Sequence, residues 1–233
     1  MRPLITSHAA CRGHAPENTL AGIRKAIALG ADAIEIDLHC TRDAVPVLLH
    51  DRTVDRTTDG SGKIADLSLR QARRLDAGAR ERIPTLREVL VEVDGRALMV
   101  LEIKAAEIEP EVLAVVRRAK ALGWCAVHSF WPDIVRRVRQ LEPKMPCSLL
   151  TSGDGVTDWG RLFAYALSLN AQGVAVEHTR ATPELVRAAH LRELRCSTWT
   201  ANKQADVRRL AAAGVDAITS DYPDRVLRWL PRR

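Results

Sequence analysis

Residues 30–50 read GADAIEIDLHCTRDAVPVLLH, and this stretch decides the fold. Its first apolar run, Ala33–Leu38, predicts a strand. Successive side chains of a strand point to opposite faces, so Glu35 and Asp37 share one face and the apolar residues share the other. In an α/β barrel the outer face of each strand packs against helices, which requires the apolar set. We therefore expect both carboxylates to point into the barrel.

The rest of the chain repeats this alternation of short apolar runs with longer amphipathic segments, which predicts a parallel sheet with helices outside it. The predicted strands are Leu4–His8, Ala33–Leu38, Val45–His50, Ala97–Lys104, Cys125–Phe130, Pro146–Thr151, Gly173–Glu177, Arg195–Thr200 and Ala217–Ser220. The predicted helices are Glu17–Leu29, Ser68–Ala77, Leu86–Val93, Pro110–Leu122, Pro132–Leu141, Trp159–Leu169, Pro183–Leu191 and Asn202–Ala213. The pattern and the length of 233 residues predict a TIM-type (β/α)8 barrel, built as a single domain over residues 1–233.

One predicted strand exceeds the eight of such a barrel. Val45–His50 follows the preceding strand too closely for a crossover helix, so the turn at residues 42–44 predicts a hairpin or a distorted barrel segment. Antiparallel pairing about this turn would place His50 almost opposite Glu35. The loop-rich residues 51–84 are then expected to form a small insertion that caps one end of the barrel.

Composition places the chain among ordinary globular proteins, with 46% hydrophobic and 27% charged residues. The net charge of +6 raises the question of a nucleic-acid partner. The basic residues, however, are spread along the predicted helices, and aromatic residues make up only 4% of the chain, which is poor material for base stacking. We therefore expect no nucleic-acid partner.

No apolar run approaches the roughly 20 residues that a membrane helix needs, and the first residues are too poor in apolar side chains for a signal peptide. The cysteines are odd in number and lack CxxC spacing, which argues against a disulfide framework or a zinc site and fits a reducing compartment. They are Cys11, Cys40, Cys125, Cys147 and Cys196. We expect a cytoplasmic protein without stable membrane association; homo-oligomerisation is left open.

Acidic residues on two predicted strands point to a bound cation. In Leu101–Lys104 the alternation places Glu102 and Lys104 on one face, as it does for Glu35 and Asp37. Three inward carboxylates and one ammonium leave a net charge of about −2, and an isolated buried anion costs several kcal/mol. A divalent cation would cancel this charge, and all-oxygen ligands favour Mg²⁺ or Ca²⁺ over zinc. The alternative is that the acids are solvated or paired with arginines.

Two histidines end predicted strands, His8 the first and His50 the third. Catalytic groups of barrels gather at the carboxyl ends of strands. A pair of histidines beside a cation can serve as general acid and general base, because the unperturbed imidazole pKa lies near neutrality. A structural role is the alternative for each alone. His128 also ends a strand and is a candidate to line the same pocket.

A series of short motifs runs in order along almost the whole chain. They are His8, Ala15–Thr19, Gly30–Asp37, Thr41–Asp43, Val47–Asp51, Asp55–Thr58, Ile83–Leu86, Leu101–Lys104, Ser129–Phe130, Trp199–Asn202 and Gly214–Pro223. In these motifs and their spacing the chain resembles the glycerophosphodiester phosphodiesterases.

This resemblance implies a TIM barrel that hydrolyses glycerophosphodiesters, as its small-molecule substrates, to an alcohol and sn-glycerol 3-phosphate with a divalent cation, Mg²⁺ or Ca²⁺. The implied metal ligands are Glu35, Asp37 and Glu102, and the implied acid/base pair is His8 and His50. By the same resemblance Lys104 would contact the phosphate, Trp199 would flank the glycerol, and Glu17, early in the first helix, would orient the site from behind. The nucleophile is either water or the neighbouring glycerol hydroxyl.

The chain departs from the family at the first strand end. The family reads His-Arg-Gly there, whereas this chain reads His8-Ala9-Ala10-Cys11-Arg12-Gly13. Either His8 is the catalytic histidine and the arginine has become Ala9, or Cys11 stands in for the histidine. The distance to the Pro-Glu-Asn-Thr motif favours the first register.

That register removes a guanidinium from the phosphate, which could cost a few kcal/mol of transition-state stabilisation. Arg12 is a candidate to reach the same phosphate. Ala9 also keeps open a barrel of this family that binds phosphodiesters with low or no turnover. A further alternative is lysophospholipase D activity on lipid phosphodiesters, for which Phe130 and Trp131 could supply an apolar rim.

Overall fold

Eight parallel strands close into a barrel in the computed structural model, which describes residues 2–230. They are β1 (Leu4–Ser7), β2 (Ala33–Cys40), β4 (Leu98–Ile103), β5 (Cys125–Ser129), β6 (Cys147–Thr151), β7 (Gly173–Glu177), β8 (Arg195–Trp199) and β9 (Ala217–Ser220). The barrel closes because β1 pairs with β9 on one side and with β2 on the other. The predicted TIM-type fold is confirmed.

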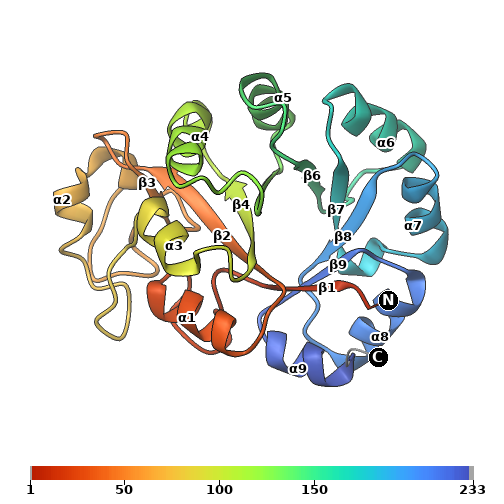
Figure 1. Cartoon of the computed structure of the whole chain (residues 1–233), viewed down its shortest axis with the longest axis horizontal. Coiled ribbons are helices and arrows are strands. Elements are labelled where there is room, and N and C mark those ends of the chain that lie inside the picture. Colours follow the sequence, from red (N-terminus) through yellow and green to blue (C-terminus); the bar gives the residue numbers. More distant parts are fainter. Residues whose placement is uncertain (1, 231–233) are drawn as a thin grey trace.

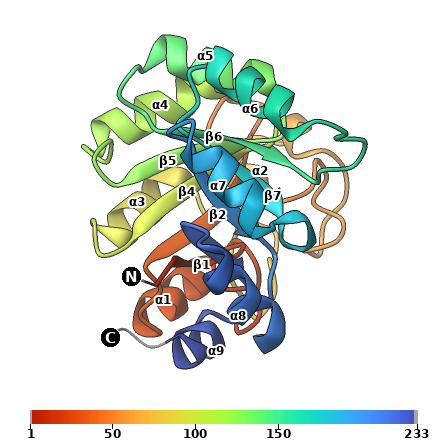
Figure 2. The same cartoon turned by 90° about the vertical axis from the view of Figure 1, so that its right-hand side faces the viewer.

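Helices follow the strands and ring the barrel (Figures 1 and 2). They are α1 (Leu20–Ala28), α3 (Leu86–Val93), α4 (Glu109–Arg118), α5 (Pro132–Leu141), α6 (Trp159–Ser168), α7 (Pro183–His190), α8 (Gln204–Ala213) and α9 (Pro223–Trp229). Local sequence sets where several begin. Thr19 caps α1 through its side chain, and Thr85 and Glu88 form a reciprocal capping box at α3.

The main core lies between the outer faces of the strands and the helices. Ile34, Ile36 and Leu38 of β2 are fully buried there. Their burial leaves the inner face of β2 to the polar residues between them, as the alternation in the sequence predicts.

A short ninth strand, β3 (Pro46–Leu48), runs antiparallel to β2 and stays outside the closed barrel. The observed register pairs Leu38 with Leu48, and the backbone N–H of Leu49 donates to the carbonyl of Asp37 at 3.0 Å. His50 therefore lies just beyond the paired residues, one position off the expected place opposite Glu35. The hairpin itself is confirmed.

The chain between β3 and α3 forms the predicted insertion, in orange at the left of Figure 1. It contains the short helices η1 (Ile64–Asp66) and α2 (Leu69–Ala72), and it has a separate small core. That core consists of Val47, Leu49, Val54, Ile64, Ala72, Ala77 and Ile83.

Some predicted bounds differ from the structure. Glu17 precedes α1 rather than lying in it, because Thr19 is the capping residue and Asn18 adopts a left-handed φ of 56°. The helix predicted to reach Ala77 ends at Ala72, and α9 was not expected at all. A short 3₁₀ turn, η2 (His178–Arg180), also follows β7. Within residues 2–230 no helix is both long and apolar enough to span a bilayer.

Candidate active site

Three carboxylates converge inside the barrel at the carboxyl ends of two neighbouring strands. Glu35 and Asp37 come from β2, and Glu102 comes from β4, where it is paired in register with Asp37. One oxygen atom from each carboxylate lies within 4.8 Å of the others. Glu35 and Asp37 are only 6% and 1% exposed. The structure thus brings together the three predicted metal ligands, which we call the acid cluster.

The acid cluster is held by three neighbouring groups. The Nζ of Lys104 lies 3.1 Å from Oδ1 of Asp37 and 2.7 Å from Oε1 of Glu102. Asn18 donates from Nδ2 to Oδ2 of Asp37 at 2.7 Å, and its Oδ1 accepts from the Asp37 backbone N–H at 3.1 Å. The backbone N–H of Ala9 donates to Oε2 of Glu35 at 2.7 Å.

One buried oxygen of the acid cluster has no partner among the described residues. Oε1 of Glu35 is buried and accepts no hydrogen bond from any described residue. Burial and the adjacent Asp37 carboxylate together raise the pKa of Glu35 to about 8. An orphaned buried oxygen in an all-carboxylate cluster with net negative charge fits a hard divalent cation, which would supply the missing contact and favour the ionised form.

The first histidine, His8, follows β1 and is tied to the end of β9. Its Nδ1 lies 2.6 Å from Oδ1 of Asp221. Asn202 fixes that carboxylate, since its Nδ2 donates to Oδ2 of Asp221 at 2.7 Å and its Oδ1 accepts from the Asp221 backbone N–H at 2.9 Å. Burial opposes charging of the imidazole, but the hydrogen bond to Asp221 and the nearby Glu35 charge outweigh it and raise the pKa of His8. Because Nδ1 is engaged, Nε2 is the ring nitrogen left for proton exchange.

The loop after β1 packs directly on the chain that carries Asp221. A Cβ built on Gly13 would lie 2.4 Å from the backbone oxygen of Asp221, so glycine is needed for this close approach. The loop therefore holds His8 against its aspartate.

The backbone of the same loop bears on the register of the first motif. Ala9 and Ala10 are fully buried with left-handed φ values of 44° and 69°. Such values favour glycine, so the glycine of the family's His-Arg-Gly corresponds naturally to Ala10. Cys11 is fully buried in the main core. Geometry therefore agrees with the register in which His8 takes the histidine position and Ala9 the arginine position.

The second histidine, His50, has a different support. Its Nδ1 lies 2.7 Å from Oδ1 of the next residue, Asp51. Arg56 donates from Nε to Oδ2 of Asp51 at 2.7 Å and from Nη2 to Oε1 of Glu17 at 2.6 Å. The Arg56 guanidinium holds the pKa of Asp51 well below its usual range. Glu17, which lies in the turn before α1, is thus linked to His50 through Arg56 and Asp51.

Arg12 lies between the two histidine–aspartate pairs. Its guanidinium nitrogens are 3.8 Å from Oδ1 of Asp221 and 3.7 Å from Oε2 of Glu17. Its side chain is 40% exposed, so the cation is open to a ligand at the site.

Trp199 ends β8 on the far side of the barrel opening. Its Nε1 donates to the carbonyl of Ala175 at 3.1 Å. The Phe130 ring, which follows β5, meets the Trp199 ring edge-on with centroids 5.3 Å apart. Because β6 and β7 separate these strands, the aromatic contact spans the opening of the barrel.

Several supporting residues were not assigned roles from sequence. Asn18, Asp51, Arg56, Asn202 and Asp221 lie in the recognised motifs, and that membership was the only available signal. His128, in contrast, was a candidate pocket residue; it pairs in register with Glu102, and burial lowers its pKa to about 4.

Comparisons with known proteins identify the family. The model of the glycerophosphoryl diester phosphodiesterase family matches residues 8–225. A glycerophosphodiester phosphodiesterase of Caldanaerobacter subterraneus is 32% identical over 97% of this chain and 97% of its own. Among solved structures, one from Silicibacter pomeroyi has a TM-score of 0.91 at 29% identity and covers 98% of this chain and 93% of that one.

A phosphodiesterase of Oleispira antarctica, solved in complex with its product sn-glycerol-3-phosphate, has a TM-score of 0.89 at 26% identity. The match covers 99% of this chain and 98% of that one. The family model spans most of the sequence, and the relatives are phosphoric diester hydrolases matched over nearly their full length. The chain belongs to the glycerophosphoryl diester phosphodiesterase family.

Proposed function

We propose that this chain hydrolyses glycerophosphodiesters to an alcohol and sn-glycerol 3-phosphate, using a divalent cation and the two histidines. The observation that carries the proposal is the acid cluster with its orphaned Glu35 oxygen, flanked by His8 and His50, each of which has Nδ1 on an aspartate. The name of the Oleispira relative's bound product supports the choice of sn-glycerol 3-phosphate.

Glu35, Asp37 and Glu102 would hold the cation, which is Mg²⁺ or Ca²⁺. When bound, it supplies positive charge that polarises the phosphoryl oxygens and offsets charge in the transition state. Asn18 and the Ala9 N–H keep the carboxylates oriented by donating to Oδ2 of Asp37 and to Oε2 of Glu35. Lys104 is already at the cluster and would contribute its charge to the phosphate side.

The two histidines would divide the proton transfers. One imidazole accepts a proton from the nucleophile, which is either water or the neighbouring glycerol hydroxyl, as the nucleophile's oxygen forms a bond to phosphorus. Attack by the glycerol hydroxyl would give a cyclic phosphate, which water then opens to sn-glycerol 3-phosphate. The other donates a proton to the leaving oxygen as the bond from phosphorus to the alcohol breaks. Each aspartate holds its imidazole in the tautomer that presents Nε2, and it stabilises the imidazolium when it forms.

The remaining predicted residues would bind substrate. Arg12, between the two pairs and 40% exposed, would supply the guanidinium that Ala9 lacks. Trp199 would present its indole to the glycerol. We also assign the reaction to the cytoplasm, because the five cysteines are all free thiols and four of them are buried.

Two alternatives rest on specific residues. Ala9 favours a phosphodiester-binding protein with low turnover, because the family's arginine is missing there. Phe130 and Trp131, 40% and 39% exposed, favour lysophospholipase D activity because they offer an apolar rim to a lipid.

The test is release of sn-glycerol 3-phosphate from glycerophosphocholine by the purified chain, in EDTA and after addition of Mg²⁺ or Ca²⁺. We expect cation-dependent product. No product from a folded protein with either cation supports the binding protein. Product from lysophosphatidylcholine at a higher rate than from glycerophosphocholine supports the lipid enzyme.

A further inference from the structure

The inner face of β2 carries one more polar side chain beyond the acid cluster, that of His39. Strand alternation places Glu35, Asp37 and His39 at successive positions on this face. His39 is only 4% exposed. Burying a polar group without a hydrogen bond costs free energy, so the hydrogen-bond partner of this imidazole indicates its role.

That partner is the main chain of a histidine proposed to transfer a proton. Nε2 of His39 lies 3.4 Å from the carbonyl oxygen of His50. Within residues 2–230 this is the one hydrogen bond of the His39 side chain. Because a carbonyl can only accept, Nε2 carries a proton and donates it. Burial lowers the pKa of His39, which favours a neutral ring with Nδ1 unprotonated.

His50 lies just past the end of a short hairpin. β3 has only three residues and stays outside the closed barrel, and its first residue, Pro46, has no N–H to donate. Beyond β3, the Leu49 N–H still donates to the Asp37 carbonyl at 3.0 Å. The His39 side chain extends this pairing by one residue, to the carbonyl of His50.

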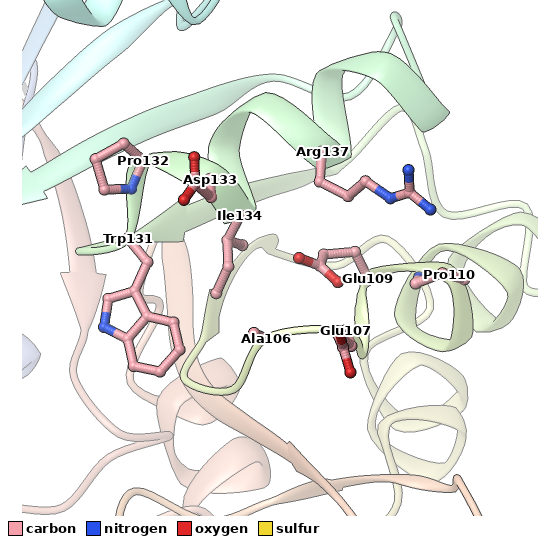
Figure 3. A pocket seen from close by; sticks show the side chains of 9 residues that line it. All are labelled: Ala106, Glu107, Glu109, Pro110, Trp131, Pro132, Asp133, Ile134 and Arg137. Atoms are coloured by element: carbon pink, nitrogen blue, oxygen red, sulfur yellow. The ribbon is translucent and has the colours of Figure 1, made fainter.

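The chain after His50 is anchored separately, at the rim of the barrel. The Arg52 guanidinium lies over the ring of Trp131, with Cζ 5.8 Å from the ring centroid. Trp131 is 39% exposed and lines a cavity between the starts of α4 and α5 (Figure 3). Since an exposed contact between a cation and a ring is weak, it holds the insertion only loosely. The buried bond from His39 ties the His50 main chain to the strand that carries Glu35 and Asp37.

We propose that His39 is a positioning residue for the reaction, because its imidazole fixes the main chain of His50 relative to the acid cluster. The inference rests on the proposed function, since His39 acts through His50. Glu35 and Asp37 would hold the cation, and His39, two residues further along β2, holds a proton-transfer group in place. Asp51 orients the His50 ring, whereas His39 fixes the backbone from which that ring projects. A displacement of about 1 Å of a reacting group can lower a rate by about 10²-fold.

Amide NMR tests the contact without turnover. The His50 carbonyl and the Asp51 N–H belong to one peptide unit, so loss of the hydrogen bond should shift the Asp51 amide signal. Two variants both remove the imidazole ring: His39→Gln keeps an N–H donor, whereas His39→Leu does not. In the isotope-labelled full chain, the Asp51 signal should move farther from its wild-type position in His39→Leu than in His39→Gln.

The matched control is His190→Leu, which removes a 42% exposed imidazole paired with Asp216 at the end of α7. It should leave the Asp51 amide signal unchanged. Equal Asp51 signals in His39→Leu and His39→Gln overturn the contact.

Steady-state rates then test the role of His39. His39→Leu should lower kcat for glycerophosphocholine about tenfold and leave KM within about twofold, because a proton-transfer group moves while the groups proposed to bind substrate stay in place. His39→Gln should recover most of the lost kcat. Calorimetric affinity for Mg²⁺ or Ca²⁺ should be unchanged in both variants, which verifies that the acid cluster is intact.

A folded His39→Leu variant with wild-type kcat, or equal losses of kcat in His39→Leu and His39→Gln, overturns the assignment. A wild-type chain without activity refutes the proposed function. The comparison of Asp51 amide signals then still decides whether His39 holds the His50 carbonyl.

Discussion

The two histidine–aspartate pairs have the same contact but different surroundings. In His8–Asp221 both side chains are 21% exposed, and the aspartate is separated from the histidine by almost the whole chain and fixed by Asn202. In His50–Asp51 the side chains are 40% and 33% exposed, and the partners are consecutive residues. One pair is built into the barrel where its first and last strands meet; the other lies where the insertion begins.

This difference indicates that the two histidine–aspartate pairs are held in place in different ways. A buried pair interacts through a lower effective dielectric, so removing either partner removes more interaction free energy. An exposed pair is screened by water and salt and needs additional groups to hold its geometry. At His50 these additional groups are Arg56 and Glu17, which hold Asp51 in place. The comparison predicts that loss of either imidazole lowers kcat to a similar extent. Loss of Asp221, in contrast, should lower kcat more than loss of Asp51.

The largest expected effect is loss of either imidazole. His8→Ala and His50→Ala should each lower kcat by about 10²–10⁴-fold, since each removes one positioned proton-transfer group. Steady-state rates on glycerophosphocholine, with circular dichroism to verify folding, measure this. A folded variant of either position with wild-type kcat would remove that histidine from the mechanism.

The two regions should also respond to pH with opposite sign. Glu35, beside the buried pair, has a pKa raised to about 8, so the metal-free folded chain binds a proton more tightly than the unfolded chain does. Unfolding free energy in EDTA should therefore fall, on the order of 3 kcal/mol, as pH rises from about 5 to 8. Asp51, in the exposed pair, has a lowered pKa, so its contribution is present at neutral pH and is lost on acidification below about 4.

Urea unfolding in EDTA at pH 5, 6.5 and 8 measures the first effect. The variant Glu35→Gln should flatten the loss between pH 5 and 8, whereas the exposed-acid control Glu184→Gln should retain it. An identical slope in wild type and Glu35→Gln would refute the assignment to Glu35.

The next largest effect on kcat is expected from loss of the aspartates, and it should differ between Asp221 and Asp51. Asp221→Ala should lower kcat about 100-fold and Asp51→Ala about 10-fold, because groups that orient a reacting side chain from behind contribute in this range and water can replace the more exposed carboxylate. In the same assay the loss caused by Asp51→Ala should shrink at high salt, because salt already screens the wild-type pair, whereas the loss caused by Asp221→Ala should change less. Equal losses at both positions would contradict the comparison.

A smaller effect is expected from the cation between the pairs. Arg12→Ala should lower kcat/KM about 10-fold through the lost phosphate contact, and Arg12→Lys should recover part of it. The matched control is Arg24→Ala, which breaks an exposed pair between Arg24 of α1 and Glu92 of α3 and should leave kcat/KM unchanged. If Arg12→Ala leaves kcat/KM unchanged, as Arg24→Ala should, then Arg12 does not replace the guanidinium that Ala9 lacks.

Sequence predicted the barrel and the acid cluster because both depend on local periodicity. The alternation around Glu35 and Asp37 fixes which side chains face inward, and the parallel register then aligns Asp37 with Glu102. β3 could be expected to form a hairpin but not to stay outside the barrel, since that depends on how many strands close it.

Other features depend on contacts distant in sequence. The Asp221 partner of His8 lies 213 residues away, and the Asn18 partner of Asp37 lies 19 residues away across a left-handed turn. No periodicity encodes such pairs. Helix α9 was missed because its seven residues offer too short a pattern.

Cation binding by the acid cluster tests the central claim most directly. Calorimetric titration of the EDTA-treated chain with Mg²⁺ and with Ca²⁺ should show one ion bound per chain, and Glu35→Gln and Glu102→Gln should abolish that binding while Glu184→Gln retains it. Binding that is the same in the wild type and in Glu35→Gln, or no binding of either ion to a folded wild-type chain, would contradict the account.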